Sequence, residues 1–598
     1  MKILLVAAIA VPMLAQTGEE VYKQSCAQCH DAAEGRVPPR FFFTLLTREG
    51  IVRSLDSGVM SVQGRALSRE ARTAVAAFLT KRTEADNLRY LAAGACAPGS
   101  KDSYPKPSPS WNRWGLNANN SRFQPAREAG ITAADVPKLK LAWAVALPGE
   151  SAARSQPAVS GGRLFAGSGD GVVFALDART GCRHWSFSAT YSIRGGLIVG
   201  DAVYFGDAGT NVYALDPRTG AEIWRTKIGE HGTAISTGTP QLHEGVLYMG
   251  VSSAEEVTSR DPAYPCCTFR GSIVALDAAT GKLKWRTYTV AEAKPTRKNK
   301  AGTQLYGPSG VGVWTTPTID AARGLLYAST GDNFSDPATN LSDAVLALEL
   351  RSGRIVWSRQ LTANDAYNNG CHTPDKVNCP EANGPDHDFG QPPILVSLGG
   401  KKRALVIGQK SGMVHSLDPD NQGEIRWQTR VAEGGVLGGI QWGSASDGEK
   451  MYVAIGDYRF KGLSPGGGFA ADPTKGGGMA ALDLLTGKKV WTAKPPVCGE
   501  RPRCSPAQSA AVTAIPGVVF AGSLDGRLRG YSAADGTVIW DFDTAREFDT
   551  VNGVKAQGGS IDAHGPVVAG GFLYTNSGYG TWGGMPGNVL LAFTPADK

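Results

Sequence analysis

A short apolar strand followed by a tight turn recurs along most of the chain. Residues 163–167 (Arg-Leu-Phe-Ala-Gly) and 246–250 (Val-Leu-Tyr-Met-Gly) are examples of these alternating strands. Each is followed by Ala-Leu-Asp, a Thr-Gly pair and a tryptophan, as in residues 175–185, 214–224 and 275–285. Looser copies end at Trp357, Trp427, Trp491 and Trp540. A Thr-Gly turn between two strand halves is typical of a hairpin, so the pattern predicts many short antiparallel strands.

Two half copies flank the seven complete ones. Trp143 has no Ala-Leu-Asp before it, and Leu-Leu-Ala-Phe at residues 590–593 has no tryptophan after it. If the two halves pair, they complete an eighth repeat and close a ring. The seven intervals from Trp143 to Trp540 span 397 residues, about 57 each, which is long enough for a four-stranded blade with loops. We therefore predict an all-β, eight-bladed β-propeller over residues 111–598, in which the repeat tryptophans only pack between blades.

The N-terminus has the pattern of an export signal. Lys2 precedes an apolar run at residues 3–11, and a small residue, Ala15, follows shortly after. This run is too short to span a bilayer, which needs about 20 apolar residues. No later segment reaches that length without charge. We predict a secretory signal peptide over residues 1–15 and a periplasmic protein with no membrane span; a buried strand or helix is the alternative interpretation.

A haem-attachment motif follows the predicted signal. In Cys26-Ala-Gln-Cys29-His30 the two thiols would bond the porphyrin and His30 would ligate the iron. Met60, ahead of an amphipathic stretch at residues 68–81, is the expected sixth ligand, and a core methionine is the alternative. A thioether ligand raises the iron potential and favours electron transfer.

These features resemble a small class I cytochrome c. They predict an α-helical cytochrome c domain with covalent haem c over residues 17–95. Residues 96–110, rich in Gly, Ser, Pro and Lys, are expected to form a linker.

The other eight cysteines suit an exported chain. Their even number permits disulfides, and proximity favours Cys371–Cys379 and Cys498–Cys504. Cys266 and Cys267 are adjacent, so they form either a vicinal disulfide or two separate thiols. Cys96–Cys182 is the pair left over.

The composition argues against two classes of protein, disordered chains and nucleic-acid-binding proteins. Hydrophobic residues make up 42% and charged residues 19% of the chain, which excludes disorder as the main state. The formal net charge of +7, spread over 598 residues, gives no argument for a nucleic-acid partner. Glycine (76) and proline (35) are abundant, as expected where turns join many short strands.

The repeat resembles the tryptophan-docking motif of pyrroloquinoline quinone (PQQ) dependent alcohol dehydrogenases, as does the segment from Trp111 to Phe123. A haem domain placed before the propeller most resembles cytochrome-type polyvinyl alcohol dehydrogenases. The resemblance implies a periplasmic quinohaemoprotein that oxidises secondary alcohol groups, polymeric ones included, by hydride transfer to PQQ. Electrons would then pass to haem c and on to an external acceptor such as a soluble cytochrome.

Three other functions stay open at this point. The first is a PQQ and haem c dehydrogenase of small alcohols. The second is a non-catalytic scaffold, since similar propellers serve in assembly at the bacterial envelope, although those lack a haem domain. The third is a haem-linked sugar or aldehyde dehydrogenase. Fold alone does not identify the substrate.

The resemblance also implies a calcium site. Family members take a carboxylate from a Ser-Ser-x-Glu segment, which here is Glu255, with Glu256 a close rival. Where the family has an asparagine, this chain has Asp332, and Asn333 is the alternative ligand. A carboxylate at that position suits a hard cation such as Ca²⁺.

Five positions match quinone contacts of the family. Trp314 would form the floor under the quinone, Arg194 would contact it, and Lys410 would lie near its oxygen. Thr237 and Trp582 are the remaining implied contacts. Calcium would polarise the quinone as a Lewis acid, and Lys410 would add positive charge where the oxyanion develops.

The catalytic aspartate has three candidates. Asp388 is the first choice, Asp365 the second and Asp386 the third, and the base would take the hydroxyl proton of the alcohol. Gly390 stands where lanthanide-using relatives carry a further aspartate, which favours calcium. Small-alcohol relatives place two adjacent cysteines before the arginine that contacts the quinone, where they cover the cofactor. Here Cys266 and Cys267 instead follow the glutamates, so their role as a cover is open.

Overall fold

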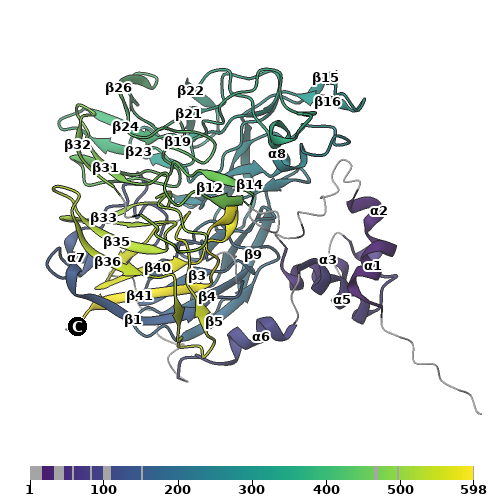
Figure 1. The fold of residues 1–598 in the computed structure, drawn as a ribbon, viewed down its shortest axis with the longest axis horizontal. Helices are drawn as coiled ribbons and strands as arrows, with labels where there is room; N and C mark the ends of the chain where they lie inside the picture. The colour runs from purple at the N-terminus through teal and green to yellow at the C-terminus, as the bar shows by residue number, and fades with distance from the viewer. Residues whose placement is uncertain are drawn as a thin grey trace, which may run out of the picture.

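The computed structural model consists of a helical N-terminal part and a ring of β-sheets (Figure 1). It describes residues 16–31, 43, 46–56, 60–80, 84–97, 110–149, 153–463, 469–494, 497–563 and 565–596. The predicted signal peptide, residues 1–15, lies outside this described part. Within it, no helix has the length and apolarity needed to cross a membrane.

The described residues of the N-terminal part form six helices: α1 (Gly18–Ser25), α2 (Ala27–His30), α3 (Arg48–Asp56), α4 (Ser61–Gly64), α5 (Arg69–Thr80) and α6 (Glu84–Ala92). Thr17 begins α1 with a capping box, because its hydroxyl accepts the Glu20 N–H while Glu20 accepts the Thr17 N–H. A small core holds α1, α3 and α5 together; its buried members are Val21, Tyr22, Phe43, Ile51, Leu55, Val75 and Ala76.

Eight antiparallel sheets form the propeller that the repeat predicts. After the entry strand β1 (Leu139–Ala146), the first sheet contains β2 (Ala158–Ser160), β3 (Arg163–Gly167), β4 (Val172–Asp177) and β5 (Arg183–Ser188), and the second contains β6 (Ile198–Val199), β7 (Val203–Gly206), β8 (Asn211–Leu215) and β9 (Glu222–Lys227). The third sheet contains β10 (Ala234–Ile235), β11 (Gln241–His243), β12 (Val246–Ser253), β13 (Ser272–Asp277) and β14 (Leu283–Tyr288). The fourth contains β18 (Thr318–Asp320), β19 (Leu325–Ser329), β21 (Ala344–Glu349) and β22 (Ile355–Gln360).

Three more sheets follow, and the last closes the ring. They are β23 (Ile394–Ser397), β24 (Arg403–Gly408), β25 (Met413–Asp418) and β26 (Glu424–Arg430); β27 (Ala445–Ser446), β28 (Lys450–Ala454), β31 (Met479–Asp483) and β32 (Lys489–Ala493); β33 (Thr513–Ile515), β34 (Val518–Gly522), β35 (Arg527–Ser532) and β36 (Val538–Asp543); and β39 (Val567–Ala569), β40 (Phe572–Ser577) and β41 (Val589–Pro595) with β1 (Leu139–Ala146).

Short elements lie between the blades. They are α7 (Ala126–Ala129), η2 (Val136–Lys138), α8 (Glu255–Thr258), β15 (Lys294–Lys298), β16 (Gln304–Gly307), β17 (Ser309–Gly310), β20 (Asn333–Ser335), η3 (Asn369–His372), β29 (Phe460–Leu463), β30 (Phe469–Ala471), β37 (Glu547–Phe548), β38 (Ala556–Gln557) and η4 (Thr581–Gly583). Of these, α8, β20, η3, β29 and η4 contribute residues to the candidate site.

The two ends of the propeller sequence meet in one blade. Strand β1 pairs antiparallel with β41, from Leu139 opposite Pro595 to Ala146 opposite Val589. The indole N–H of Trp540 donates to the carbonyl of Leu139 at 3.2 Å, which joins the preceding blade to this one. The predicted closure is confirmed, and it leaves no open edge between the first and last blades.

The repeat tryptophans pack between blades, as expected. The Trp185 indole N–H donates to the carbonyl of Pro217 in the next blade at 3.1 Å. A Cβ on Gly220, whose φ is +76°, would lie 2.6 Å from the same indole ring, so the turn needs glycine for both space and conformation. Equivalent bonds run from Trp224 to Ala278, Trp285 to Leu350, Trp427 to Leu484 and Trp491 to Ala533.

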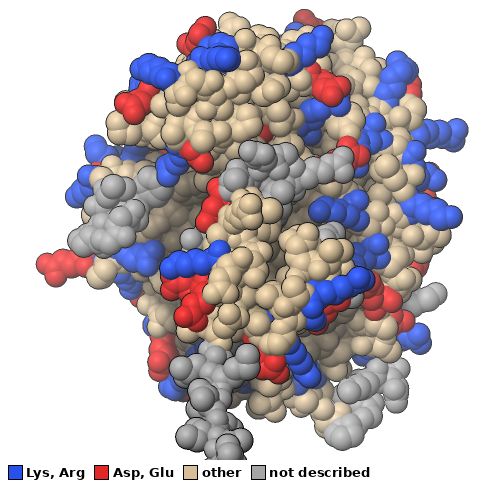
Figure 2. Space-filling view, turned by 90° about the vertical axis from the view of Figure 1, so that its right-hand side faces the viewer, with Lys and Arg blue, Asp and Glu red and all other residues tan. Residues whose placement is uncertain are grey.

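Four disulfides cross-link the structure, including both short loops expected from proximity. They are Cys96–Cys182, Cys266–Cys267, Cys371–Cys379 and Cys498–Cys504. The adjacent cysteines are therefore bonded to each other rather than separate thiols. Cys26 and Cys29 stay free, as haem attachment requires. On the face shown in Figure 2, basic and acidic side chains are interspersed.

Candidate active site

A cavity of about 960 Å³ opens among the loops that join the propeller strands. Segments from many blades contribute to its wall. The polar lining includes Arg194, Thr237, Glu256, Arg260, Asp332, Tyr367, His372, Asp386, Asp388, Lys410, Gln441 and Arg459; the apolar lining includes Ile235, Trp314, Phe334, Val436, Leu437, Trp442, Phe460 and Trp582. Aromatic side chains beside convergent polar groups are typical of a site for an organic cofactor.

Carboxylates gather on one side of this cavity. Oxygen atoms of Asp332, Asp386 and Asp388 lie within 4.8 Å of one another, and Glu256 lines the same cavity. Burial raises the pKa of Asp332 well above its ordinary value, and the charges of Asp388 and Asp386 add to this rise. Among the described residues, no donor reaches the buried Oδ2 of Asp332. A buried carboxylate oxygen without a hydrogen-bond partner suits a hard divalent cation as a ligand.

One ammonium group lies among these acids. Lys410 Nζ donates to Oδ1 of Asp386 at 2.7 Å and to Oδ2 of Asp388 at 3.0 Å. It also lies 5.6 Å from the centre of the Trp314 ring. Burial alone would lower the pKa of Lys410, but Asp386 and Asp388 raise it well above its usual value. Lys410 is therefore a fixed cation beside the aromatic floor.

Backbone contacts hold Asp388 in place. Its Oδ1 accepts the Asp332 N–H at 2.8 Å, and its own carbonyl accepts the Lys410 N–H at 3.1 Å. A Cβ on Gly331 would lie 2.7 Å from Oδ1 of Asp388, so only glycine leaves room for this carboxylate. One carboxylate oxygen is thus anchored, while the other meets Lys410 at the cavity surface.

Trp314 presents a supported aromatic ring to the cavity. Trp442 packs edge-on against it, with ring centres 5.4 Å apart. A Cβ on Gly390 would lie 2.5 Å from the Trp314 ring, so that glycine also permits the packing. The Thr237 hydroxyl donates to the Trp314 carbonyl at 3.1 Å and lines the cavity beside it. An aromatic ring held by these contacts and lining the cavity suits a planar cofactor such as a quinone.

Positive charge lines another part of the wall. Burial lowers the pKa of Arg194 to about 9, and the neighbouring Arg154 contributes. Arg194 thus stays protonated at neutral pH. Within the described residues, no carboxylate forms an ion pair with either arginine. An unpaired arginine on a cofactor cavity suits an anionic ligand such as the carboxylates of PQQ.

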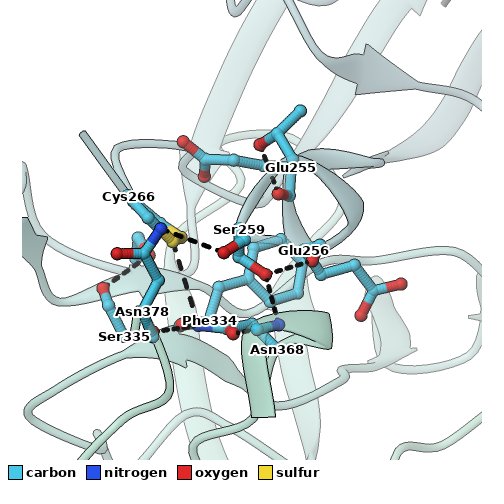
Figure 3. The surroundings of a disulfide bond; sticks show 12 residues. Glu255, Glu256, Ser259, Cys266, Phe334, Ser335, Asn368 and Asn378 are labelled. Carbon is cyan, nitrogen blue, oxygen red and sulfur yellow. Dashed lines mark hydrogen bonds between the residues drawn. A yellow bond between two sulfur atoms is a disulfide. The ribbon is translucent and has the colours of Figure 1, made fainter. Parts of the chain in front are cut away.

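The structure favours Glu256 over the first choice of glutamate, Glu255. The Glu255 carboxylate points away from the cavity and accepts the backbone N–H groups of Thr268 and Phe269, each at 2.8 Å. The Glu256 side chain points in a different direction (Figure 3) and lines the cavity. Adjacent residues on the short helix α8 necessarily face different ways, so only one of them can reach the site. Glu256 replaces Glu255 as the candidate ligand.

Two further candidates lie outside the cavity lining. The Asn333 amide donates to the Ser309 carbonyl at 3.0 Å and accepts the Thr339 N–H at 2.7 Å, which leaves Asp332 as the residue at the site. Asp365 accepts the backbone N–H groups of Asp386 and His387 at 3.1 and 2.8 Å. It therefore supports the loop that carries Asp386 and Asp388, which stay as the candidates for the base.

Some cavity residues were not foreseen. Tyr367 and Tyr458 line the wall, and the Tyr458 hydroxyl donates to the carbonyl of Trp582 at 2.8 Å. Trp582 itself, a predicted contact, lines the cavity with 38% of its surface exposed. Trp442 also went unpredicted. The sequence could have indicated Trp442 as a site residue, because this tryptophan falls outside the repeat spacing.

The vicinal disulfide does not cover this cavity. Cys266 and Cys267 are buried beside Phe334 and are absent from the cavity lining (Figure 3). The Asn368 amide approaches the Cys266 sulfur at 3.8 Å. The bonded pair thus packs against the loop that leads into η3.

The haem-motif residues share one small core. Burial raises the pKa of the Cys26 thiol, and nearby Cys29 adds to the effect. His30 is buried, with its ring centre 4.8 Å from that of Phe43, and Met60 packs against the same cluster. The chain therefore brings His30 and Met60 to one helical domain, which is what two axial ligands require.

Family models match both parts of the chain. Residues 14–79 match a model described as cytochrome C oxidase, cbb3-type, subunit III. Residues 226–424 match one described as glucose/ethanol/alcohol dehydrogenase, beta-propeller domain. Residues 48–265 and 345–592 match one described as outer membrane protein assembly factor BamB.

Two relatives align with nearly the whole chain. A polyvinylalcohol dehydrogenase of Pseudomonas sp. is 38% identical over 97% of this chain and 94% of its own length. Another, of Sphingopyxis sp., is 37% identical over 98% of this chain and 94% of its own length. The structure of quinohemoprotein alcohol dehydrogenase from Comamonas testosteroni superposes with a TM-score of 0.61 at 20% identity, covering 86% of this chain and 85% of that one, which supports the fold.

Proposed function

The chain belongs to the polyvinyl alcohol dehydrogenase family of PQQ-dependent alcohol dehydrogenases with a cytochrome domain, and from this premise we propose that it oxidises the secondary hydroxyl groups of polyvinyl alcohol in the periplasm. Cys26 and Cys29 would hold haem c, which would supply a one-electron carrier toward an external acceptor. The main support is the cavity in which carboxylates, Lys410 and the Trp314 ring converge. Membership of an enzyme family sets aside the scaffold alternative.

The cavity residues fit PQQ and calcium. Glu256, Asp332 and one of the two aspartates near Lys410 would hold Ca²⁺, Trp314 would lie under the quinone, and Arg194 would meet its carboxylates. When bound, PQQ supplies a two-electron acceptor and calcium supplies Lewis acidity. The unpartnered Oδ2 of Asp332 supports the metal assignment.

Each charged group has a defined task in the proposed reaction. Asp388 is the base, and its Oδ2 at the cavity surface accepts the hydroxyl proton of the alcohol. Lys410, held at 3.0 Å from that oxygen, stabilises the carboxylate before the transfer. It would also place positive charge near the quinone oxygen, where negative charge develops during oxidation. Glu255 and Asp365 hold the backbone around these groups.

Localisation rests on chemistry as well as on the predicted signal. Four disulfides persist only in an oxidising compartment, and the bacterial periplasm is one. Covalent attachment through Cys26 and Cys29, which are free thiols, would put the haem in the same compartment.

A comparison of substrates tests the proposal. Purified enzyme loaded with PQQ and Ca²⁺ is assayed with polyvinyl alcohol, 2-propanol and 1-propanol at equal hydroxyl concentration. We expect kcat/KM to be highest for the polymer and to be higher for 2-propanol than for 1-propanol. Faster turnover of 1-propanol than of either secondary alcohol would instead assign the enzyme to small primary alcohols.

A further inference from the structure

The helical domain touches the propeller at the start of α3. Leu46 forms an isolated antiparallel bridge with Tyr191. The Thr47 N–H donates to the Thr190 carbonyl at 3.2 Å, and the Thr47 hydroxyl lies 3.0 Å from the same oxygen. Thr47 Oγ1 also accepts the Gly50 N–H at 2.9 Å, so one side chain both caps α3 and binds the propeller.

The two surfaces fit too closely for an added side chain. A Cβ on Gly50 would overlap the Thr190 carbonyl oxygen. From the propeller side, a Cβ on Gly171 would lie 2.6 Å from both the Thr47 methyl group and the Tyr191 carbonyl oxygen. Thr47 is only 3% exposed. The contact is therefore a shaped interface between two glycine-lined surfaces.

A second attachment fixes the other end of the same strand. The Cys96–Cys182 disulfide and the Ala95–Arg183 bridge hold the chain after α6 to the start of β5. Residues 189–191, which meet α3, directly follow the end of β5. In Figure 1, α6 lies beside β5 and the α1–α5 group stands next to the propeller. The helical part of the chain therefore contacts the propeller at both ends of β5.

The docked segment leads directly into the active-site cavity. Arg194, which lines the cavity, follows Thr190 by four residues, so their Cα atoms are at most about 14 Å apart. The Ile193 N–H donates to the Ser168 carbonyl at 3.1 Å, and the Ser155 hydroxyl donates to the Gly195 carbonyl at 2.7 Å. The segment is thus fixed between the interface and the cavity.

On the haem side, helix α3 joins the interdomain contact to the core of the helical domain. Ile51, four residues after Thr47 and about 6 Å along the helix, belongs to the buried core against which Met60 packs. Helix α3 therefore has one end on the propeller and its body against the expected haem pocket.

The geometry points to residues 189–194 as the docking surface for the haem domain and the electron route from the quinone cavity. This inference rests on the proposed function. Oxidation of one secondary alcohol to a ketone releases two electrons and two protons. The haem iron accepts the electrons singly, from ferric to ferrous, and an external ferric cytochrome c reoxidises it each time.

A steric variant tests the route. Gly50→Leu pushes α3 away from Thr190, whereas Arg69→Leu adds the same side chain at an exposed position on α5 of the same domain. Stopped-flow spectroscopy follows haem reduction after alcohol is added, and a phenazine dye measures alcohol oxidation without the haem. We expect Gly50→Leu to slow haem reduction at least tenfold, with dye reduction within twofold of wild type. The haem spectrum and potential of PQQ-free protein should match those of Arg69→Leu.

The outcomes separate the two claims. Equal haem reduction rates in Gly50→Leu and Arg69→Leu would overturn the route. Dye reduction without haem reduction in the wild type would overturn it too, while alcohol oxidation would stand. Absence of dye reduction with every alcohol would overturn the proposed function and this inference with it.

A cross-link tests the docking independently of turnover. Paired residues in an antiparallel bridge have Cα separations of about 4.5–5.5 Å, which a disulfide can span. In PQQ-free protein, the Leu46→Cys/Tyr191→Cys double variant should form an interdomain disulfide, detected by peptide mass spectrometry. After loading, haem reduction should stay within threefold of wild type. A missing cross-link, or haem reduction lost in the cross-linked protein, would contradict the inference.

Discussion

Lys410 Nζ lies 3.0 Å from Oδ2 of Asp388, on the wall of a cavity that also holds three other carboxylates. One ammonium group faces the side chains of Glu256, Asp332, Asp386 and Asp388. When these acids are ionised, the one lysine among them leaves an excess of buried negative charge, which is costly. A bound divalent cation would offset this excess, which is why we propose a metal-assisted oxidation centre here.

The base assignment predicts a selective loss of activity. Asp388→Asn keeps the shape and still accepts the Asp332 N–H through its amide oxygen, but it cannot take a proton. We expect kcat to fall by about 10²–10⁴-fold, the usual worth of a general base. Steady-state assays should show this while PQQ binding, followed by tryptophan fluorescence, persists. Wild-type kcat in Asp388→Asn together with loss in Asp386→Asn would move the role to Asp386.

The two adjacent glutamates should separate metal binding from stability. Glu256→Gln removes a carboxylate from the cavity, so calcium affinity should fall at least tenfold with little change in Tm. In Glu255→Gln, an amide NH₂ group replaces one of the two carboxylate oxygens that accept backbone N–H groups. One N–H group then loses its acceptor, which costs about 1–3 kcal/mol of folding stability.

Calcium titration and thermal unfolding of both variants measure these effects. The reverse pattern, with Glu255→Gln losing calcium and Glu256→Gln losing stability, would restore Glu255 as the ligand.

Calcium affinity should depend on pH near neutrality. Burial raises the pKa of Glu256 in the metal-free protein to about 7; Lys410 opposes this rise and Asp388 adds to it. Below that pH the side chain is protonated, and calcium must displace the proton to bind. Affinity should therefore fall as the pH drops from 8 to 6. Glu256→Gln should flatten this part of the profile, and an unchanged pH slope in that variant would contradict the prediction.

Met60 should set the haem potential. Replacing a thioether ligand removes a group that raises the iron potential, so Met60→Ala should lower it. Spectroelectrochemistry of PQQ-free protein measures this without turnover. An unchanged potential would assign Met60 to the hydrophobic core alone.

Much of the architecture follows from local sequence. The Thr-Gly turn and its tryptophan recur because each glycine packs under an indole of the neighbouring blade, and that contact needs both residues at fixed spacing. The half repeats at Trp143 and residues 590–593 predicted the closing blade for the same reason. The disulfides within short loops followed from proximity alone.

The site was predictable only in part. Glu255 and Glu256 are adjacent, and their directions are decided by the backbone N–H groups of residues 268 and 269, which no local pattern reveals. Asp365 resembles a catalytic residue, but loop geometry turns it toward backbone donors. The contact of Thr47 with Thr190 joins residues 143 positions apart, which periodicity cannot foresee.

The most direct test of the account uses haem-loaded protein free of PQQ. Calcium, PQQ and then polyvinyl alcohol or 2-propanol are added while the haem absorption spectrum is recorded. We expect the haem to be reduced only when all three are present. Once an acceptor is supplied, two electrons should reach it for each alcohol oxidised. Haem reduction without PQQ, or none with any alcohol, would contradict it.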